Sequence, residues 1–352
     1  MIRGMTAPSL PTTGRLLELV EAMSGQPVVM LVDLVADLFI TGTPKRISRE
    51  APVLILSYQG ERLVPGGGAN AVANVAALGG RPLPLGVVGD DASGRGLLEA
   101  FHEHGVTTQG IQVRSGYRTP TKVRILGGGK HSIKQQIVRY DIEETLELTS
   151  GERDKLAESL EHWSGEARVA ILSDYGYGTV EPGLLPRVRE ALGPEATLVC
   201  DSRFRLGDFR GLDGATPNEE EAEALLGSAI DEDPARLAKG GNALRELLMA
   251  RFLLITRGSR GMSLFERRSV AHLPVHGTDQ VADVTGAGDT VIGTFALALA
   301  AGATPLEAAL LANYAGGVVV MKMGTATLTR EELRHAVESD PGILEELRWA
   351  RS

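Results

Sequence analysis

The sequence predicts an α/β protein with a doubly wound, mostly parallel β-sheet and helices on both of its faces. Short runs rich in Val, Ile and Leu alternate with longer amphipathic stretches that end at glycine, which is typical of buried parallel strands and their connecting helices. The chain has 43 glycines among 352 residues, which suits a fold with many tight turns. The predicted strands are 27–34, 167–174, 196–201 and 252–258, and the predicted helices are 70–80, 94–105, 183–193 and 218–227.

Two stretches, 38–65 and 117–141, depart from this pattern. In the second, Lys122 and Arg124 alternate with apolar residues, which is typical of half-exposed antiparallel strands. The segments TGTPKR (41–46) and GGGK (127–130) are predicted as hairpin loops. Because α/β cores often reach this length, we expect residues 1–352 to form one domain.

Composition limits the function. The net charge is −9 and no basic tract is present, so neither nucleic acid nor an anionic membrane surface is an expected partner. No apolar run reaches the roughly 18 residues of a membrane span, and the N-terminus lacks a signal pattern, so a cytoplasmic location is expected. Cys200, the only cysteine, is predicted to be a buried strand residue.

The segment DVTGAGDT (283–290) precedes an apolar helical stretch. A glycine-rich turn at a helix start leaves the backbone N–H groups of Gly286, Ala287 and Gly288 available for an anion, which the helix dipole also favours. A carboxylate beside an anion site repels it unless it has a task there, so Asp289 is interpreted as the base that takes a proton from an attacking hydroxyl. The alternative is an ordinary Asp N-cap on a glycine-rich helix start.

A second glycine-rich segment, PGGGANAVANVAALGG (65–80), precedes and enters a predicted helix. Its glycines allow the backbone to approach a polyhydroxylated ligand, and the amide of Asn70 can both donate to and accept from a hydroxyl. The alternative is a glycine turn followed by a helix cap.

Both segments resemble the signatures of the ribokinase-type carbohydrate kinases, the PfkB family, and Asp289 falls on that family's catalytic base. The segments 48–56, 172–178 and 312–333 are similar to the heptose-7-phosphate kinase branch. The resemblance extends over roughly residues 15 to 335. It implies a ribokinase-like fold in which the half-exposed strands form a small β lid over the sugar, and it implies a homodimer that pairs through this lid.

The resemblance also implies site residues. Asp37, Gly66, Gly67 and Asn70 match sugar-binding positions, although Asp37 could also be a solvated turn residue. Departures from the branch occur at this end: Tyr177 stands where a lysine is usual, and DSRF (201–204) replaces a lysine-containing segment. Cations that could compensate by meeting a substrate phosphate are Lys122, Arg124, Arg139, Arg203 and Arg205.

On the nucleotide side, Asn218 and Glu221 match an Asn-x-x-Glu pattern that holds Mg²⁺ through water. The alternative is a favourable acidic first helical turn. Asp283 matches a position that helps to bind a monovalent cation such as K⁺ in some relatives. Positions that match the ATP-binding loops and the surroundings of adenine are Thr256, Gly258, Gly261, Asn313 and 324–329.

These features predict an ATP- and Mg²⁺-dependent kinase that phosphorylates a hydroxyl of a sugar or sugar phosphate, with a heptose-7-phosphate-like substrate preferred. Three alternatives remain open. The first is another kinase of the family, acting on a ketose, ribose or a nucleoside. The second is a noncatalytic sugar- or nucleotide-binding regulator, which the intact GAG segment and Asp289 disfavour because a regulator has no need of the base. The third is an ADP-dependent sugar kinase, although the overall motif match favours ATP.

Overall fold

A computed structural model describes residues 10–129, 134–230, 233–277 and 282–351. Its main sheet has the strand order β14-β13-β12-β11-β10-β9-β8-β1-β4-β5. The strands from β11 to β5 are parallel, and β12, β13 and β14 add antiparallel pairs at one edge. The bounds are β1 (Pro27–Val32), β4 (Arg81–Gly89), β5 (Ile111–Arg114), β8 (Val169–Asp174), β9 (Thr197–Ser202), β10 (Gly214–Ala215), β11 (Phe252–Thr256), β12 (Met262–Glu266), β13 (Ser269–Leu273) and β14 (Arg348–Arg351).

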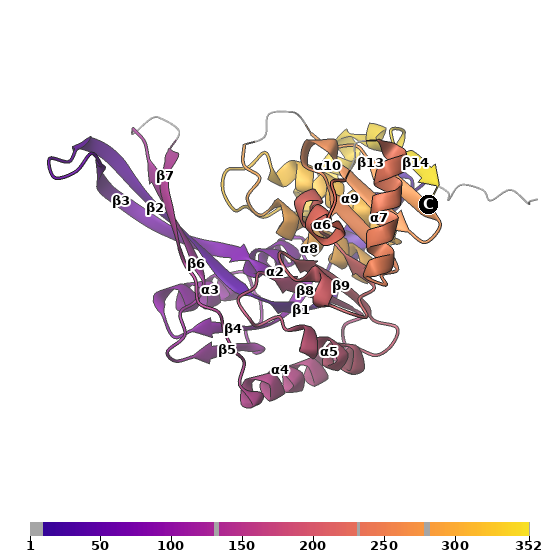
Figure 1. Ribbon diagram of the computed structural model, residues 1–352, viewed down its shortest axis with the longest axis horizontal. Helices are drawn as coiled ribbons and strands as arrows, with labels where there is room; N and C mark the ends of the chain where they lie inside the picture. The colour runs from indigo at the N-terminus through magenta and orange to yellow at the C-terminus, as the bar shows by residue number, and fades with distance from the viewer. Residues whose placement is uncertain (1–9, 130–133, 231–232, 278–281, 352) are drawn as a thin grey trace, which may run out of the picture.

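Helices cover both faces of this sheet, as the alternating pattern predicts (Figure 1). Successive side chains of β1 enter two separate cores: Met30 packs with α1, α2, α3, α8, α9 and α10, and Leu31 packs with α4, α5, α6 and α7. The bounds are α1 (Thr13–Ala22), α2 (Gly68–Ala77), α3 (Ala92–Glu103), α4 (Ser150–Trp163), α5 (Leu185–Leu192), α6 (Glu219–Leu226), α7 (Pro234–Leu247), α8 (Ala287–Ala300), α9 (Pro305–Val319) and α10 (Arg330–Ser339).

A second sheet with the order β3-β2-β6-β7 projects from the body of the molecule (Figure 1). We call these four strands the lid: β2 (Leu34–Ile47), β3 (Leu54–Gly67), β6 (Thr121–Gly127) and β7 (Gln135–Ile142). The expected stretch 38–65 lies within β2, β3 and their turn, and 117–141 contains β6 and most of β7.

The hairpin loop predicted at 41–46 was wrong, because TGTPKR belongs to β2 and pairs with β3. Register shifts at Thr41/Gly42 and Pro44/Arg46 accommodate the glycine and the proline as irregularities within the strand. The chain turns later, where the N–H of Ser48 donates to the carbonyl of Val53. Of the other predicted loop, Gly127 ends β6 and Lys130 lies outside the described residues.

Polar residues follow several parallel strands at one edge of the main sheet. Asp33 comes directly after β1, Asp174 ends β8, and Asp201 lies near the end of β9. Ligands of open α/β sheets bind beyond such carboxyl ends. Cys200 is a buried residue of β9, and burial raises the pKa of its thiol. None of the described helices combines the length and the apolar character that crossing a membrane requires.

Candidate active site

The turn before α8 has a conformation that only glycine adopts easily. Gly286 caps the helix with φ 79°, and a Cβ there would lie 2.5 Å from the side-chain nitrogen of Asn70. The N–H of Ala287 donates to the carbonyl of Val284 at 3.3 Å. Within the described chain no acceptor pairs with the N–H of Gly286 or Gly288. Two of the three predicted anion-binding groups therefore remain available at the helix N-terminus.

Asp289 follows in the first turn of α8, and its side chain is buried. The hydroxyl of Tyr175 donates to Oδ1 at 2.7 Å, and Nδ2 of Asn70 donates to Oδ2 at 3.2 Å. Burial raises the pKa of Asp289 to about 7, against the lowering effects of Tyr175, Asn70 and Lys122. A carboxyl group with this pKa can exchange a proton near neutral pH, as a general base must.

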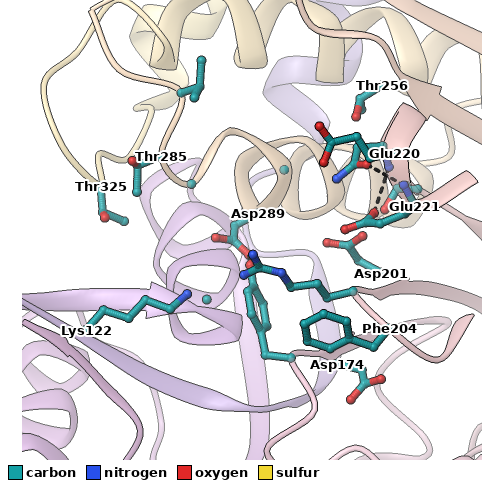
Figure 2. A pocket seen from close by; sticks show the side chains of 18 of the residues that line it. Lys122, Asp174, Asp201, Phe204, Glu220, Glu221, Thr256, Thr285, Asp289 and Thr325 are labelled. Carbon is teal, nitrogen blue, oxygen red and sulfur yellow. Dashed lines mark hydrogen bonds between the residues drawn. The ribbon is translucent and has the colours of Figure 1, made fainter. Parts of the chain in front are cut away.

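Asp289 lies in a polar cavity of about 680 Å³. Figure 2 shows Asp289 between two groups of side chains, with Asp201 and Glu221 on one side and Lys122 and Thr325 on the other. The chain segments that form the cavity come from the lid, from the carboxyl ends of β8, β9 and β11, and from the turn before α8. This polar cavity is the candidate active site.

The predicted sugar-binding residues occupy different places around the polar cavity. Asp37 and Gly67 line it. Gly66 packs against Asp37, where a Cβ would lie 2.7 Å from the carboxyl carbon. Asn70 does not line the cavity; its side chain bonds to the carbonyl of Gly286 and to Asp289. Asn70 therefore supports the turn before α8 and the carboxylate of Asp289.

Four cationic side chains line the polar cavity, three from the lid and Arg203 from the segment after β9, and they differ in their partners. Arg124 donates to Asp37 at 2.6 Å, and Arg139 donates to Asp141 at 2.8 Å. Lys122 lies over the ring of Tyr175, and Arg203 lies over the ring of Phe204. Burial lowers the pKa of Lys122, while Asp37 and Asp289 raise it. Arg205, the fifth cation considered from the sequence, pairs with Asp174 and does not line the cavity.

Acidic side chains line the opposite wall. Asn218 caps α6 by accepting from the N–H of Glu221, and the Glu221 side chain accepts from the N–H of Asn218. Glu221 also belongs to the acidic first turn of α6, as the alternative expected, and both residues line the polar cavity, so this structural role does not exclude a binding role. Burial raises the pKa values of Asp201 and Glu221, and Glu221 raises that of Asp201 further.

These acidic residues fit Mg²⁺. A buried carboxylate whose pKa is raised by a neighbouring carboxylate, as that of Asp201 is by Glu221, is stabilised in its ionised form by a divalent cation. Mg²⁺ commonly uses one or two carboxylates together with water and phosphate. Within the described ranges, no three His, Cys, Asp or Glu side chains form a closed metal site. Water and nucleotide oxygens would therefore have to supply the remaining ligands.

A second, smaller cavity of about 190 Å³ adjoins the first, and we call it the apolar cavity. Thr256, Val284 and Gly288 line both cavities. Three of the predicted nucleotide-site residues, Gly258, Gly261 and Asn313, also line the apolar cavity. Its mostly apolar lining suits a flat heteroaromatic ring.

Two predicted positions lie elsewhere. Asp283 lines neither cavity, and its carboxylate accepts from the N–H groups of Thr285 and Gly324. Burial opposes ionisation of Asp283, but these bonds lower its pKa overall. The segment 324–329 was expected near adenine, yet Thr325 lines the polar cavity and donates to Asp37.

Sequence reasoning missed the roles of Tyr175, Asp33 and Asp201. Tyr175 belongs to the LSDYGYG segment, but only folding brings it to Asp289, which lies 114 positions away. Asp33 accepts backbone N–H groups from the same segment. The available signal was position, because Asp33 and Asp201 each lie near the end of a predicted strand, where open α/β sheets hold ligands.

Comparison with known proteins relates the chain to one family. The model of the pfkB family carbohydrate kinases matches residues 29–162 and 209–332. The bifunctional protein HldE of Mesorhizobium japonicum is 39% identical over 321 residues, covering 89% of this chain and 62% of the relative. HldE of Nitrosococcus oceani is 40% identical over 317 residues, covering 88% of this chain and 63% of the relative. The chain thus spans less than two thirds of these relatives.

Solved structures support the fold. A ribokinase from Arabidopsis thaliana, complexed with ribose and ATP, superposes with a TM-score of 0.70 at 20% identity, covering 89% of this chain and 99% of the ribokinase. Phosphofructokinase-2 from Escherichia coli gives a TM-score of 0.71 at 17% identity, with the same coverage. The predicted ribokinase-like fold is thereby confirmed. The family match and the relatives at 39–40% identity show that the chain belongs to the pfkB family of carbohydrate kinases.

Proposed function

We propose that this kinase transfers the γ-phosphoryl group of ATP to a hydroxyl of a sugar phosphate, with a heptose-7-phosphate-like molecule as the preferred acceptor. The observation that carries the proposal is the position of Asp289. The buried carboxylate lies in the polar cavity, one residue after Gly288, which lines both cavities. A nucleotide whose base occupies the apolar cavity would present its phosphates at this junction.

In the proposed reaction, the acceptor hydroxyl attacks the γ-phosphorus while the bond between that phosphorus and the β,γ-bridging oxygen breaks, and ADP leaves. Asp289 orients the hydroxyl and takes its proton, which contributes about 10²–10⁴ in rate. The N–H groups of Gly286 and Gly288 stabilise charge on the transferred group. With the lid over the acceptor, water is kept from the phosphoryl group.

Asp201 and Glu221 are the residues that would hold Mg²⁺, Glu221 through water. When bound, the ion neutralises phosphate charge. Asn218 and Thr256 would lie beside the phosphates, and Gly258, Gly261 and Asn313 beside the nucleoside. A role for Asp283 in K⁺ binding stays a prediction, which a comparison of K⁺ with a large organic cation in the assay tests.

A phosphate on the acceptor is favoured by the cations that line the polar cavity. Among the described residues neither Lys122 nor Arg203 forms a direct ion pair, although Asp37 and Asp289 interact electrostatically with Lys122 and Glu221 with Arg203. Arg139 has one direct partner, the partly exposed Asp141. Arg203 stands in the segment where the heptose branch has a lysine, so the positive charge is retained nearby. Asp37, Gly66 and Gly67 would meet the hydroxyl groups of the sugar.

A substrate panel tests this proposal. ADP release is measured with a heptose 7-phosphate, the same heptose without phosphate, fructose, ribose and a nucleoside, with Asp289→Asn as the inactive control. The highest kcat/KM is expected for the heptose 7-phosphate. Equal or faster turnover of an unphosphorylated compound would reject the sugar-phosphate acceptor. Binding of sugar and ATP without turnover of any compound would support a noncatalytic regulator instead.

We also propose a homodimer that pairs through the lid. Exposed apolar side chains extend along it, and they include Ile47, Tyr58, Val138 and Tyr140. Such a surface is typical of an interaction site. Light scattering should give twice the mass of one chain, and Tyr58→Lys together with Tyr140→Lys should give the mass of one chain.

A further inference from the structure

The carboxylate of Asp289 is held by donors from two distant parts of the chain. Tyr175, directly after β8, donates its hydroxyl to Oδ1 at 2.7 Å, and Asn70 in α2 donates to Oδ2 at 3.2 Å. Each carboxylate oxygen has two lone pairs, so both oxygens keep one acceptor position for another partner. The contact from Tyr175 is the shorter of the two. Together the two bonds orient the carboxylate and so the direction in which its remaining lone pairs point.

Tyr175 is itself fixed by a buried aspartate. Asp33 accepts N–H bonds from Tyr175, Tyr177 and Thr179, each at 2.9 Å. Within the same loop, Gly178 has φ 100°, and a Cβ there would lie 1.9 Å from the carbonyl oxygen of Leu146. The backbone of the loop is thus held by the bonds to Asp33 and by the close packing of Gly178 against Leu146. The loop that carries Tyr175 is therefore preorganised, and it holds the phenol hydroxyl against Asp289.

Other charged groups also face Asp289. Lys122 on β6 favours its ionised form, whereas Asp37 on β2 opposes it. Asp201 on β9 is a further acidic neighbour, since Asp289 raises the pKa of Asp201. Arg124 neutralises Asp37 through a direct ion pair. Apart from Lys122, the groups that stabilise the ionised carboxylate are the two hydrogen-bond donors. Loss of one donor should raise the pKa of Asp289 further, because burial disfavours the charged form.

We propose that Tyr175 is a positioning residue that keeps Asp289 ionised and aimed at the acceptor hydroxyl, and that Asp33 fixes Tyr175 for this task. The inference rests on the proposed role of Asp289 as the base. During transfer the acceptor proton goes to Asp289, and Tyr175 keeps its own proton. Burial raises the pKa of Tyr175 well above its usual value, so the phenol remains a donor throughout.

The test compares Tyr175→Phe with Tyr177→Phe. Tyr177 is in the same loop, but its hydroxyl donates to Glu143 and it does not line the polar cavity. We expect Tyr175→Phe to move the acidic limb of kcat/KM to higher pH by about one unit, as the loss of one hydrogen bond to a charged group implies. Activity at pH 7 should fall roughly fivefold, because the pKa of Asp289 would rise from about 7 by one unit, and it should recover towards pH 9, with KM for ATP unchanged. Tyr177→Phe should keep the wild-type profile.

A second substitution makes the test independent of any damage to folding. Fluorotyrosine at position 175 keeps the shape of the side chain and is a stronger donor, so the acidic limb should move to lower pH. An unchanged limb in both the phenylalanine and the fluorotyrosine proteins would overturn the inference. Asp289→Asn distinguishes failure of the proposed base from failure of the positioning role. Activity of Asp289→Asn above a tenth of wild type would reject Asp289 as the base. An inactive Asp289→Asn protein, together with an unshifted acidic limb in the Tyr175 variants, would reject only the role of Tyr175.

Discussion

Arg124 and Asp37 form a buried ion pair in which the guanidinium donates to Oδ1 of the carboxylate at 2.6 Å. The exposed fractions of the two residues are 8% and 2%. The pair joins two adjacent lid strands, β6 and β2, and Thr325 from the body of the molecule donates to the other oxygen of Asp37. The Asp37 carboxylate therefore connects the two lid strands to Thr325, a residue that lines the polar cavity.

Removing one partner of this pair should be costly. Arg124→Met leaves a buried carboxylate without its cation, and we expect the free energy of unfolding to fall by about 3–5 kcal/mol in urea titration. The double change Arg124→Met with Asp37→Asn removes both charges and should recover much of the loss. Arg46→Met, an exposed change near the outer end of β2, is the matched control. A loss below about 1 kcal/mol for Arg124→Met would show that the pair is solvated.

The sequence predicts the parts of the site that depend on local pattern. A glycine turn that enters an apolar helix specifies an anion-binding terminus within eight residues, so Gly286, Gly288 and Asp289 could be identified without a structure. The strands and helices of the main sheet follow from periodicity in the same way, and their predicted bounds differ only slightly from the observed ones. The strand predicted at 252–258, for example, ends at Thr256, where the chain enters a tight turn.

Contacts between distant segments could not be predicted. Tyr175 and Asp289 meet only because β8 and α8 pack side by side, and no spacing rule links residues so far apart. The prediction of a hairpin loop at 41–46 was wrong for another reason. Thr, Gly and Pro at 41–46 have high turn propensity, but pairing with β3 along the whole strand overrides it through two bulges.

The burial of Asp289 predicts an unusual dependence of stability on pH. Its pKa rises from 3.8 in the unfolded chain to about 7 in the folded protein, so between these values the folded protein holds a proton that the unfolded chain has lost. This group therefore lowers the free energy of unfolding as pH rises from 4 to 7, and its cost is complete above 7. Asp289→Asn should be more stable than wild type by a few kcal/mol at pH 8, and equally stable below pH 4. Parallel urea titrations at both pH values measure this, and a difference that does not change with pH would contradict it.

The two glycines of the anion site should respond differently to substitution. A Cβ on Gly288 meets nothing within 4 Å, so Gly288→Val should fold normally while its side chain enters the junction of the two cavities. We expect a loss of kcat/KM of at least about a hundredfold, comparable to losing one donor of an anion site. Gly286→Ala instead meets Asn70 and has an unfavourable φ, so it should lower the melting temperature as well. An active Gly288→Val enzyme would show that the phosphate binds elsewhere.

The last prediction concerns the acceptor phosphate. Arg139 lines the lid side of the polar cavity and is held by Asp141, so its guanidinium is oriented but keeps donors for an anion. If the acceptor carries a phosphate, Arg139→Ala should raise KM for the sugar phosphate by ~10- to 100-fold, the cost of a lost charged hydrogen bond, and change KM for ATP little. The same change should not affect KM for the unphosphorylated sugar, which therefore serves as the internal control. Lys45→Ala, at an exposed position of β2 outside the cavity, controls for general loss of lid charge. Equal KM values for the sugar with and without phosphate in the wild-type enzyme would reject the phosphate site, because a bound phosphate must contribute to affinity through these cations.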